Sequence, residues 1–529
     1  MFDGLAPASL ATIDWLVIAL YAIGLVVLGL TVSRRHARPE DYFLASRASG
    51  WLSIGLALLA SNISSTALVG LAGAAYAIGV SVYDYEWMAC VVLVFFCIFL
   101  LPFILSSRVY TMPEYLERRY DRRARLYLAL LTLLLNVFVD SAGGLYCGAL
   151  LCRLIFPGLE LWQIAALLAG LAGVYTLSGG LRAVIYTEIV QAVILFGGAL
   201  VISIAAFARA GGWHKVMGSV DPAMLSLIRP IGDPGVPWPG LVLGVPLLGF
   251  YYWCTNQMMM QRVISARSLD HGRWGALFAG LLKLPILFLM VLPGTAALLL
   301  FPHLPKADMV YPTLIFSLLP QGLVGLVVAG FLAATMAAVA STLNSASTLI
   351  TMDVIRPLLP AVSDRLLVRT GRVATAGLMV LAVLWAPQLE HFPSLWQYLQ
   401  GALAYAVPPI VALFLVGLFW RGANAAGAAA TLALGTLSGA ALFLANEVWH
   451  LTTLHFLYAA PLLVVLDSAI LVGVSLWRRQ PAAETVLVWT PQFYRAESAR
   501  LAVAPLWRNY RVLATLLLAL TAAVVVAFR

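Results

Sequence analysis

The chain reads Ala60-Ser61-Asn62-Ile63-Ser64-Ser65-Thr66 in the middle of a long apolar segment, and Gly70, Gly73 and Gly79 follow. Polar side chains are costly in hydrocarbon, and such a run before glycines is typical of a helix interrupted near its middle. A break of this kind exposes backbone carbonyls and helix ends to a solute or an ion. A second interpretation stands beside it, in which the hydroxyls bond back to the preceding turn of an intact helix.

The composition around this stretch indicates a membrane protein. Of the 529 residues, 62% are hydrophobic and 10% are charged, a balance that water-soluble domains do not keep. Apolar segments long enough to cross about 30 Å of hydrocarbon as helices recur along the chain. They are unbroken rather than alternating, which excludes a barrel and leaves helices. We therefore expect an all-α polytopic membrane protein.

Apolar windows predict about fourteen membrane-spanning helices within a single transmembrane domain that covers residues 1–529. The predicted spans are 12–33, 50–78, 84–106, 126–155, 160–178, 184–208, 238–261, 274–302, 320–354, 371–387, 396–420, 423–446, 454–477 and 511–528. Their boundaries are expected to hold within a few residues.

Basic residues gather in alternate loops and indicate the orientation of the chain. Clusters such as Arg34, Arg35 and Arg38 share one side, and the other side holds little beyond Arg153, Arg209, Lys215, Arg229 and Lys306. The positive-inside rule then predicts a multi-pass protein of a bacterial-type inner membrane with both termini outside the cytoplasm. The net charge of +9 is a topology signal, so we expect no nucleic-acid partner. Residues 114–125 fit a juxtamembrane helix that touches the lipid bilayer.

Aromatic and polar side chains cluster in two other spans. Tyr83-Asp84-Tyr85-Glu86-Trp87 begins one span, and Tyr251-Tyr252-Trp253-Cys254-Thr255-Asn256-Gln257 lies deep in another. Rings beside carboxylate and amide groups suit a sugar, because its apolar face stacks on rings while its hydroxyls take hydrogen bonds. The first cluster lies near a predicted membrane edge, so an interfacial aromatic belt is the alternative there.

Isolated polar groups mark two further spans. Lys283 stands alone in an apolar segment, and a buried ammonium must find a carboxylate, a carbonyl or a solute. Gln400 and Tyr405 precede Pro408-Pro409, where the double proline bends the helix and frees backbone carbonyls. Both Lys283 and Gln400 also have a purely structural interpretation.

No catalytic or nucleotide-binding motif accompanies these groups. The chain lacks a Walker loop, a dinucleotide fingerprint after a strand and a catalytic triad. Its five cysteines fall inside predicted spans without the spacing of a zinc site or a disulfide framework. We therefore expect a protein that is not an enzyme and that needs no cofactor.

Three long stretches, in order, resemble the sodium/solute symporter family, and most closely its sodium/glucose cotransporter branch. They are residues 175–188 (YTLSGGLRAVIYTE), residues 252–257 (YWCTNQ) with Gln261-Arg262 after them, and residues 343–353 (LNSASTLITMD). The resemblance covers nearly the whole chain. It implies a LeuT-like core of five plus five helices in an inverted repeat, with alternating access around a midplane site. The repeats would span about 50–208 and 238–420, with peripheral helices at 12–33, 423–446, 454–477 and 511–528.

The resemblance also implies a solute site. The family's sugar-contacting positions fall on Asn62, Glu86, Lys283 and Gln400, and its inner aromatic gate falls on Tyr252 and Trp253. Three positions depart from the family: Ala67 replaces Gln or His, Asp140 replaces Asn or Lys, and Gly249 replaces Asn or Thr. A sugar is the expected solute, and Asp140 adds a modified or amino sugar as an option.

The implied sodium site departs further. Its carbonyl ligands fall on Ala60, Ile63 and Ala334, but its two hydroxyl ligands become Ala337 and Ala338, and Ala340 replaces a nearby hydroxyl. Sodium is a hard cation that needs oxygen ligands, which a methyl group cannot supply. Glu188 stands where the family has aspartate and is a possible proton site, or else it pairs with Arg182.

These observations predict a secondary-active transporter of a small polar solute, a sugar above all. Sodium symport is the family habit, and weak sodium dependence is what Ala337 and Ala338 predict. Three alternatives stay open: a proton-coupled sugar transporter, an uncoupled one, and a solute sensor on the same scaffold that does not transport.

Overall fold

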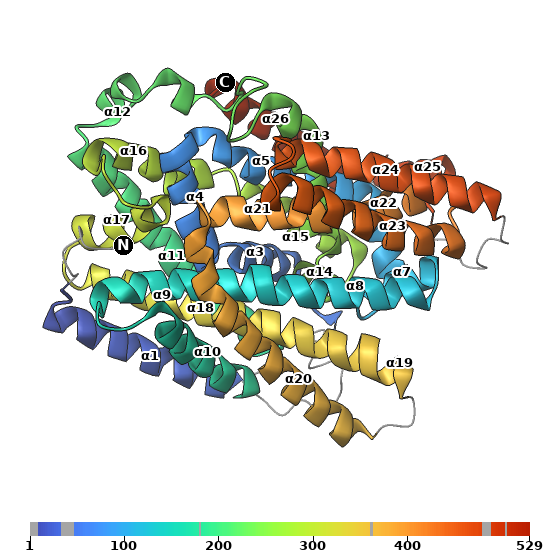
Figure 1. The fold of residues 1–529 in the computed structure, drawn as a ribbon, viewed down its shortest axis with the longest axis horizontal. Helices are drawn as coiled ribbons and strands as arrows, with labels where there is room; N and C mark the ends of the chain where they lie inside the picture. Colours follow the sequence, from blue (N-terminus) through green and yellow to red (C-terminus); the bar gives the residue numbers. More distant parts are fainter. Residues whose placement is uncertain (1–8, 33–46, 179–180, 360–362, 479–487, 503–504) are drawn as a thin grey trace.

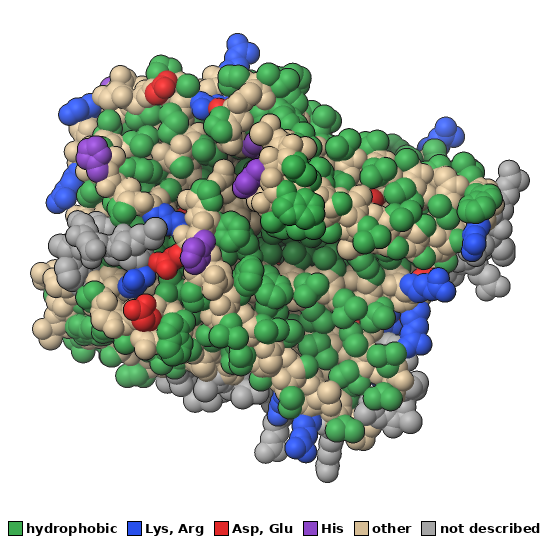
Figure 2. Space-filling model, viewed as in Figure 1, with side chains coloured by type: hydrophobic (Ala, Val, Ile, Leu, Met, Phe, Trp, Pro, Cys, Tyr) green, Lys and Arg blue, Asp and Glu red, His purple; other side chains and the backbone are tan. Residues whose placement is uncertain are grey.

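The computed structural model describes residues 9–32, 47–178, 181–359, 363–478, 488–502 and 505–529, with the side chains at 25–32, 174–178, 181–189, 357, 364, 365 and 368 outside the description. The described residues form helices and two isolated bridges, without a named strand. Figure 2 shows hydrophobic side chains over most of one face, with Lys and Arg toward its ends. So broad an apolar surface suits lipid rather than water. The predicted all-α membrane architecture is confirmed.

The helices follow one another along the chain with short connections (Figure 1). Those before residue 220 are α1 (Thr12–Val32), α3 (Trp51–Asn62), α4 (Ser65–Ile78), α5 (Asp84–Phe95), α6 (Leu101–Ser107), α7 (Met112–Arg119), α8 (Arg122–Leu135), α9 (Ala142–Ile155), α10 (Leu161–Ser178), α11 (Leu181–Arg209) and α12 (Trp213–Ser219). Next come α13 (Trp238–Phe250), α14 (Gln257–Ile264), α15 (Leu269–Leu281), α16 (Leu292–Leu300), α17 (Val310–Leu318), α18 (Leu323–Thr348), α19 (Arg356–Leu358), α20 (Asp364–Trp385), α21 (Leu395–Ala406) and α22 (Pro408–Phe419). The last are α23 (Ala425–Phe443), α24 (Phe456–Trp477), α25 (Pro491–Ala502) and α26 (Tyr510–Ala527).

The polar stretch after Ala60 breaks its helix, as predicted. α3 ends at Asn62, α4 begins at Ser65, and their axes are bent by 59°. Ile63 leaves the helical region with φ −82° and ψ 79°, and Ser64 is extended. Ser61 does bond back to the carbonyl of Ala57 at 2.7 Å, but the helix is not intact. The alternative of an unbroken helix is therefore wrong.

Two further breaks lie in the second half of the chain. α21 and α22 are bent by 55° at Val407, directly before Pro408-Pro409, where proline removes a backbone donor. α13 passes through a wide turn, η6 (Tyr251–Thr255), and stops at Asn256, whose ψ of 126° is extended. The predicted span 238–261 is thus not one continuous helix. The Asn256 side chain accepts a hydrogen bond from the Met258 amide at 2.9 Å and so begins α14.

Eight of the described helical segments are long and apolar enough to cross a membrane, or up to ten when each bent pair is one span. Shorter apolar helices include Thr12–Gly24, Leu161–Gly173, Leu287–Leu300 and Ala307–Leu318. Each predicted span overlaps a helix or a run of helices. The number fourteen stays a prediction.

The first half of the broken helix packs closely on α15. A Cβ on Gly275 of α15 would lie 2.8 Å from Ile54, and one on Gly55 of α3 would lie 2.9 Å from the Gly275 carbonyl oxygen. Glycines let the two backbones approach, which is how membrane helices gain packing where lipid offers no hydrophobic driving force. The contact holds α3 beside the turn that follows α15, and that turn carries Lys283.

Candidate functional site

A cavity of about 140 Å³ lies beside the break in α3 and α4. Its walls come from both halves of the broken helix and from α5, α18 and α21, together with η6 and the turn after α15. Pockets for drug-sized ligands hold about 300 Å³ or more, so this space suits a smaller solute. The cavity brings together all seven residues predicted for solute binding and gating, namely Asn62, Glu86, Asp140, Tyr252, Trp253, Lys283 and Gln400.

Lys283 is the centre of the polar wall. Its Nζ donates hydrogen bonds to Asn62 Oδ1 and to Glu86 Oε2, and the ion pair with Glu86 is almost fully buried. The ammonium also lies 5.3 Å from the ring centre of Trp253, within reach of a cation–π interaction. The partner that the sequence required for Lys283 is thus a carboxylate and an amide, both near the helix break.

Two residues of the Tyr83–Trp87 cluster, Tyr85 and Glu86, line the cavity. Tyr83 and Asp84 are fully buried and Glu86 is 5% exposed. The Tyr83 hydroxyl donates to the Leu284 carbonyl at 3.0 Å, and this bond holds the Lys283 turn against the start of α5. The alternative of an aromatic belt at the membrane edge is therefore wrong for these residues.

Asp140 and Gln400 face the cavity from opposite elements. Asp140 lies in the wide turn η4 (Asn136–Ser141) between α8 and α9, and Gln400 lies on α21. Within the described part of the chain, neither side chain has a hydrogen bond or an ion pair. The small residues Ala67 and Gly249 line the same cavity. The positions that depart from the family pattern thus lie around one space, with polar groups free to meet a solute.

Aromatic rings close the rest of the cavity. Tyr252 and Trp253 meet edge to face at 5.3 Å, and the Tyr252 hydroxyl accepts a hydrogen bond from Asn62 Nδ2 at 3.3 Å. Tyr85 and Trp396 form a second edge-to-face pair at 5.4 Å and also line the cavity. Sequence reasoning missed Trp396, although its place one turn before Gln400 on α21 could have indicated it.

A second, much smaller cavity lies next to the first. It holds about 10 Å³, roughly the room of a single water-sized sphere. Its lining includes all five residues predicted for the sodium site, namely Ala60, Ile63, Ala334, Ala337 and Ala338. Ser61, Ser64, Met258 and Ala338 line both cavities. The structure therefore brings the predicted ion-site residues together, and Ala337 and Ala338 line the cavity with methyl side chains.

Besides Ser61, three oxygen-bearing side chains line the small cavity. Ser64 bonds to Thr66, and Ser341 accepts a hydrogen bond at 3.0 Å from Nη2 of the fully buried Arg262. The Gln191 amide is the third, and sequence reasoning missed it, although an amide inside an apolar span is a signal. Glu188, the predicted proton site, belongs to α11, and the structure does not describe its side chain.

Comparisons with known proteins bear on the family and the fold. The model of the sodium:solute symporter family matches residues 42–435. A sodium/mannose cotransporter of Bos taurus is 34% identical over 535 residues, which cover 91% of this chain and 89% of that protein. Sodium/glucose cotransporter 4 of Danio rerio is 32% identical over 523 residues, covering 89% and 80%. A solved structure of a substrate-bound, outward-open, sodium-coupled sialic acid symporter has a TM-score of 0.76 at 20% identity, covering 90% of this chain and 100% of that chain. This likeness confirms the predicted LeuT-like fold.

Proposed function

Because this chain belongs to the sodium:solute symporter family, we propose that it carries a small polar solute, namely a sugar, across the membrane by alternating access. The family and the relatives are transporters, so the chain is a transporter rather than an enzyme. The wall formed by Lys283, Glu86 and Asn62 beside aromatic rings is the observation that carries the sugar proposal. Several hydroxyls of one small molecule can exchange hydrogen bonds with this wall while its apolar face lies on a ring.

The free carboxylate of Asp140 supports a finer proposal about the solute. It faces the cavity without a cationic partner among the described residues, and a carboxylate there favours a positively charged group. We therefore propose that a sugar bearing an amine competes with neutral sugars for this site. Two relatives, a sodium/mannose and a sodium/glucose cotransporter, support the neutral sugar as the first candidate.

Coupling is the part of the proposal that departs from the family name. The small cavity is lined by Ala60, Ile63 and Ala334, to which the family resemblance assigns carbonyl ligands, and by Ala337 and Ala338, whose side chains are methyl groups. A dehydrated sodium ion would lack two oxygen ligands there. We propose that sodium stimulates transport weakly or not at all, and that a proton or no ion takes its place. Glu188 is the candidate proton site, and Glu188→Gln would then abolish accumulation while solute exchange continues.

The proposal extends to organisation and location. Residues 50–208 and 238–420 form the two repeats of one transporter domain, and the remaining helices are peripheral. The protein lies in the inner membrane of a bacterial-type cell with both termini outside the cytoplasm, as its loop arginines favour.

One experiment tests function and coupling together. The purified chain in proteoliposomes is given a panel of neutral and amino sugars, with sodium and proton gradients imposed separately. We expect uptake of at least one sugar, with little stimulation by sodium. Binding without uptake would show a sensor, and strong sodium-driven uptake would overturn the coupling proposal while the sugar proposal stands.

A further inference from the structure

A groove outside the transport site lies between α15 and α26. It encloses about 690 Å³, and its lining divides into a polar end and an apolar end. The polar end holds Arg267, His271 and Arg508 with tryptophan rings beside them. The apolar end is a set of leucines on the two helices, which include Leu281 and Leu516. We propose that this groove binds one anionic phospholipid, with its phosphate at the arginines and an acyl chain along the leucines.

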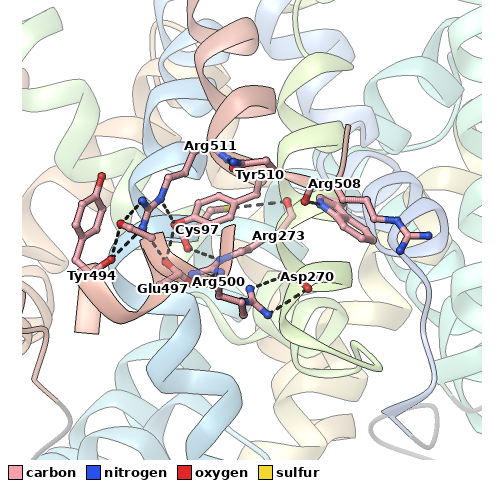
Figure 3. A network of polar contacts seen from close by, with 12 residues as sticks. Cys97, Asp270, Arg273, Tyr494, Glu497, Arg500, Arg508, Tyr510 and Arg511 are labelled. Atoms are coloured by element: carbon pink, nitrogen blue, oxygen red, sulfur yellow. Dashed lines mark hydrogen bonds and ion pairs between the residues drawn. The ribbon is translucent and has the colours of Figure 1, made fainter. Parts of the chain in front are cut away.

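Charge is the first argument, because the nearby carboxylates already have partners. Glu497 pairs with Arg273 and, at 3.3 Å, with Arg511, and Asp270 pairs with Arg500 at 2.9 Å. Figure 3 shows this network, with the Arg508 side chain extending away from it. No ion pair joins Arg267 or Arg508 to any described carboxylate. The groove therefore presents two unpaired cations, which an anionic headgroup complements.

The fixed geometry of the polar end is the second argument. The Trp274 indole donates to the Arg508 carbonyl at 3.2 Å, which ties the start of α26 to α15. Arg267 Nη2 lies 2.7 Å from His271 Nε2, and His271 Nδ1 accepts the Trp51 amide at 3.1 Å. The Arg267 guanidinium has five N–H donors and one imidazole nitrogen accepts at most one of them, so Arg267 keeps donors for another acceptor. Tryptophans at this level are typical of a membrane interface.

The third argument is the direction of the apolar end. Leu513 and Leu520 on α26 both line the groove, and seven residues of helix advance about 10 Å. The groove thus runs from the arginines into the depth expected for hydrocarbon. Trp507 is 73% exposed and Leu516 is 59% exposed, which leaves the groove open along its length. A free phosphate would use only the polar end, whereas a phospholipid uses both.

The test is native mass spectrometry of the full chain in detergent after incubation with phosphatidylglycerol or phosphatidylcholine. We expect phosphatidylglycerol to be retained preferentially. Arg267→Gln with Arg508→Gln should lower its retention by about fivefold for each arginine. The matched control removes the same charge from exposed arginines that do not line the groove, by Arg421→Gln with Arg495→Gln, and should keep retention within about twofold.

A second variant probes the apolar end without changing charge. Leu516→Trp fills the groove at an exposed position, so the protein should fold normally while retention of phosphatidylglycerol falls several-fold. Equal retention of both lipids by the unmutated protein, or equal losses in the groove and control arginine variants, would overturn the proposal. Displacement of the lipid by glycerol phosphate alone, or a dimer that replaces it, would overturn it as well.

Discussion

The two adjacent cavities share the break between α3 and α4 but differ in what lines them. The larger one has a buried ion pair, two free polar side chains and five aromatic rings, whereas the smaller one presents alanine methyl groups beside three serines and one glutamine. Ser61 and Ser64 belong to both walls. The contrast teaches that a solute site can keep its chemistry while the ion site beside it loses ligands. The helix break contributes residues to both cavities, and the other side chains distinguish them.

The largest effect is expected from Lys283→Ala in the polar cavity. It leaves Glu86 buried without its cation, which costs about 3–5 kcal/mol of stability. It also removes the ammonium group that would donate a hydrogen bond to the solute. Sugar uptake should fall by at least a hundredfold, and the thermal midpoint should drop. Adding Glu86→Gln should restore the midpoint but not uptake.

The exposed pair of Arg500 and Asp270 is the control for Lys283. Arg500→Ala should cost no more than about 1 kcal/mol, because exposed ion pairs contribute little, and uptake should stay normal. Normal uptake in the Lys283→Ala, Glu86→Gln variant would remove Lys283 from the solute site.

Adding hydroxyl groups to the small cavity should give it the ion ligands that it lacks. Ala337→Ser with Ala338→Ser adds two ligands, and sodium should then stimulate uptake at concentrations on the order of tenfold lower, or more, which corresponds to about 1.4 kcal/mol. Uptake is measured against sodium concentration at constant ionic strength. Ala346→Ser, buried on the same helix away from the cavity, is the control. The same sodium response in control and double variant would argue against the ion-site assignment.

Asp140→Asn tests whether the solute carries a positive charge. A hydrogen bond to an ionised group contributes about 1.5–3 kcal/mol against about 1 for a neutral pair, so the preference for an amino sugar over its neutral counterpart should fall about tenfold. Competition between the two sugars for uptake measures this preference. Uptake of the neutral sugar alone should change little. An unchanged preference for the amino sugar would show that Asp140 does not bind its amine.

Gln400→Ala should produce a moderate loss of affinity. The amide has no partner among the described residues, so its removal costs only the bond to the solute, about 1 kcal/mol or fivefold. Gln397→Ala on the same helix does not face the cavity and is the matched control. Equal apparent affinities of the two variants for the sugar would show that Gln400 is structural.

The smallest effect is expected at the gate. Tyr252→Ala should speed solute exit from preloaded liposomes a few-fold with little change in affinity, because a gate acts on release. Tyr252→Phe keeps the ring and loses only the 3.3 Å bond with Asn62, so its exit rate should stay near normal. A large loss of affinity at an unchanged exit rate would place Tyr252 among the solute ligands.

Much of the site followed from local chemistry in the sequence. The polar run after Ala60 and the double proline at Pro408 both predict a bend, because each removes normal helix bonding at one point. Lys283 was expected to need a partner, since an ammonium cannot stay alone in hydrocarbon. That its partners are Glu86 and Asn62 rests, at the level of sequence, on the family resemblance, because residues so far apart in the chain meet only in the tertiary fold.

Other features were not predicted, because a hydropathy window averages over about 20 residues and hides short changes of backbone. The end of α13 at Asn256 is a short change of backbone within an apolar segment, which a window of about 20 residues does not detect. The number of membrane crossings is blurred for the same reason, since bent pairs and short helices can each be counted in two ways. The pairing of Arg262 with Ser341 depends on how α14 and α18 pack, which periodicity does not define.

The methyl groups of Ala337 and Ala338 bear on the largest sugar gradient that a cell could maintain. One sodium ion that crosses with each solute under 100 mV contributes about 2.3 kcal/mol, which sustains roughly a fiftyfold concentration ratio. With no ion bound, the ratio at rest is one, and net flux reverses whenever the inner concentration exceeds the outer. The two missing side-chain oxygens would then distinguish a transporter that concentrates its sugar from one that only equilibrates it across the membrane.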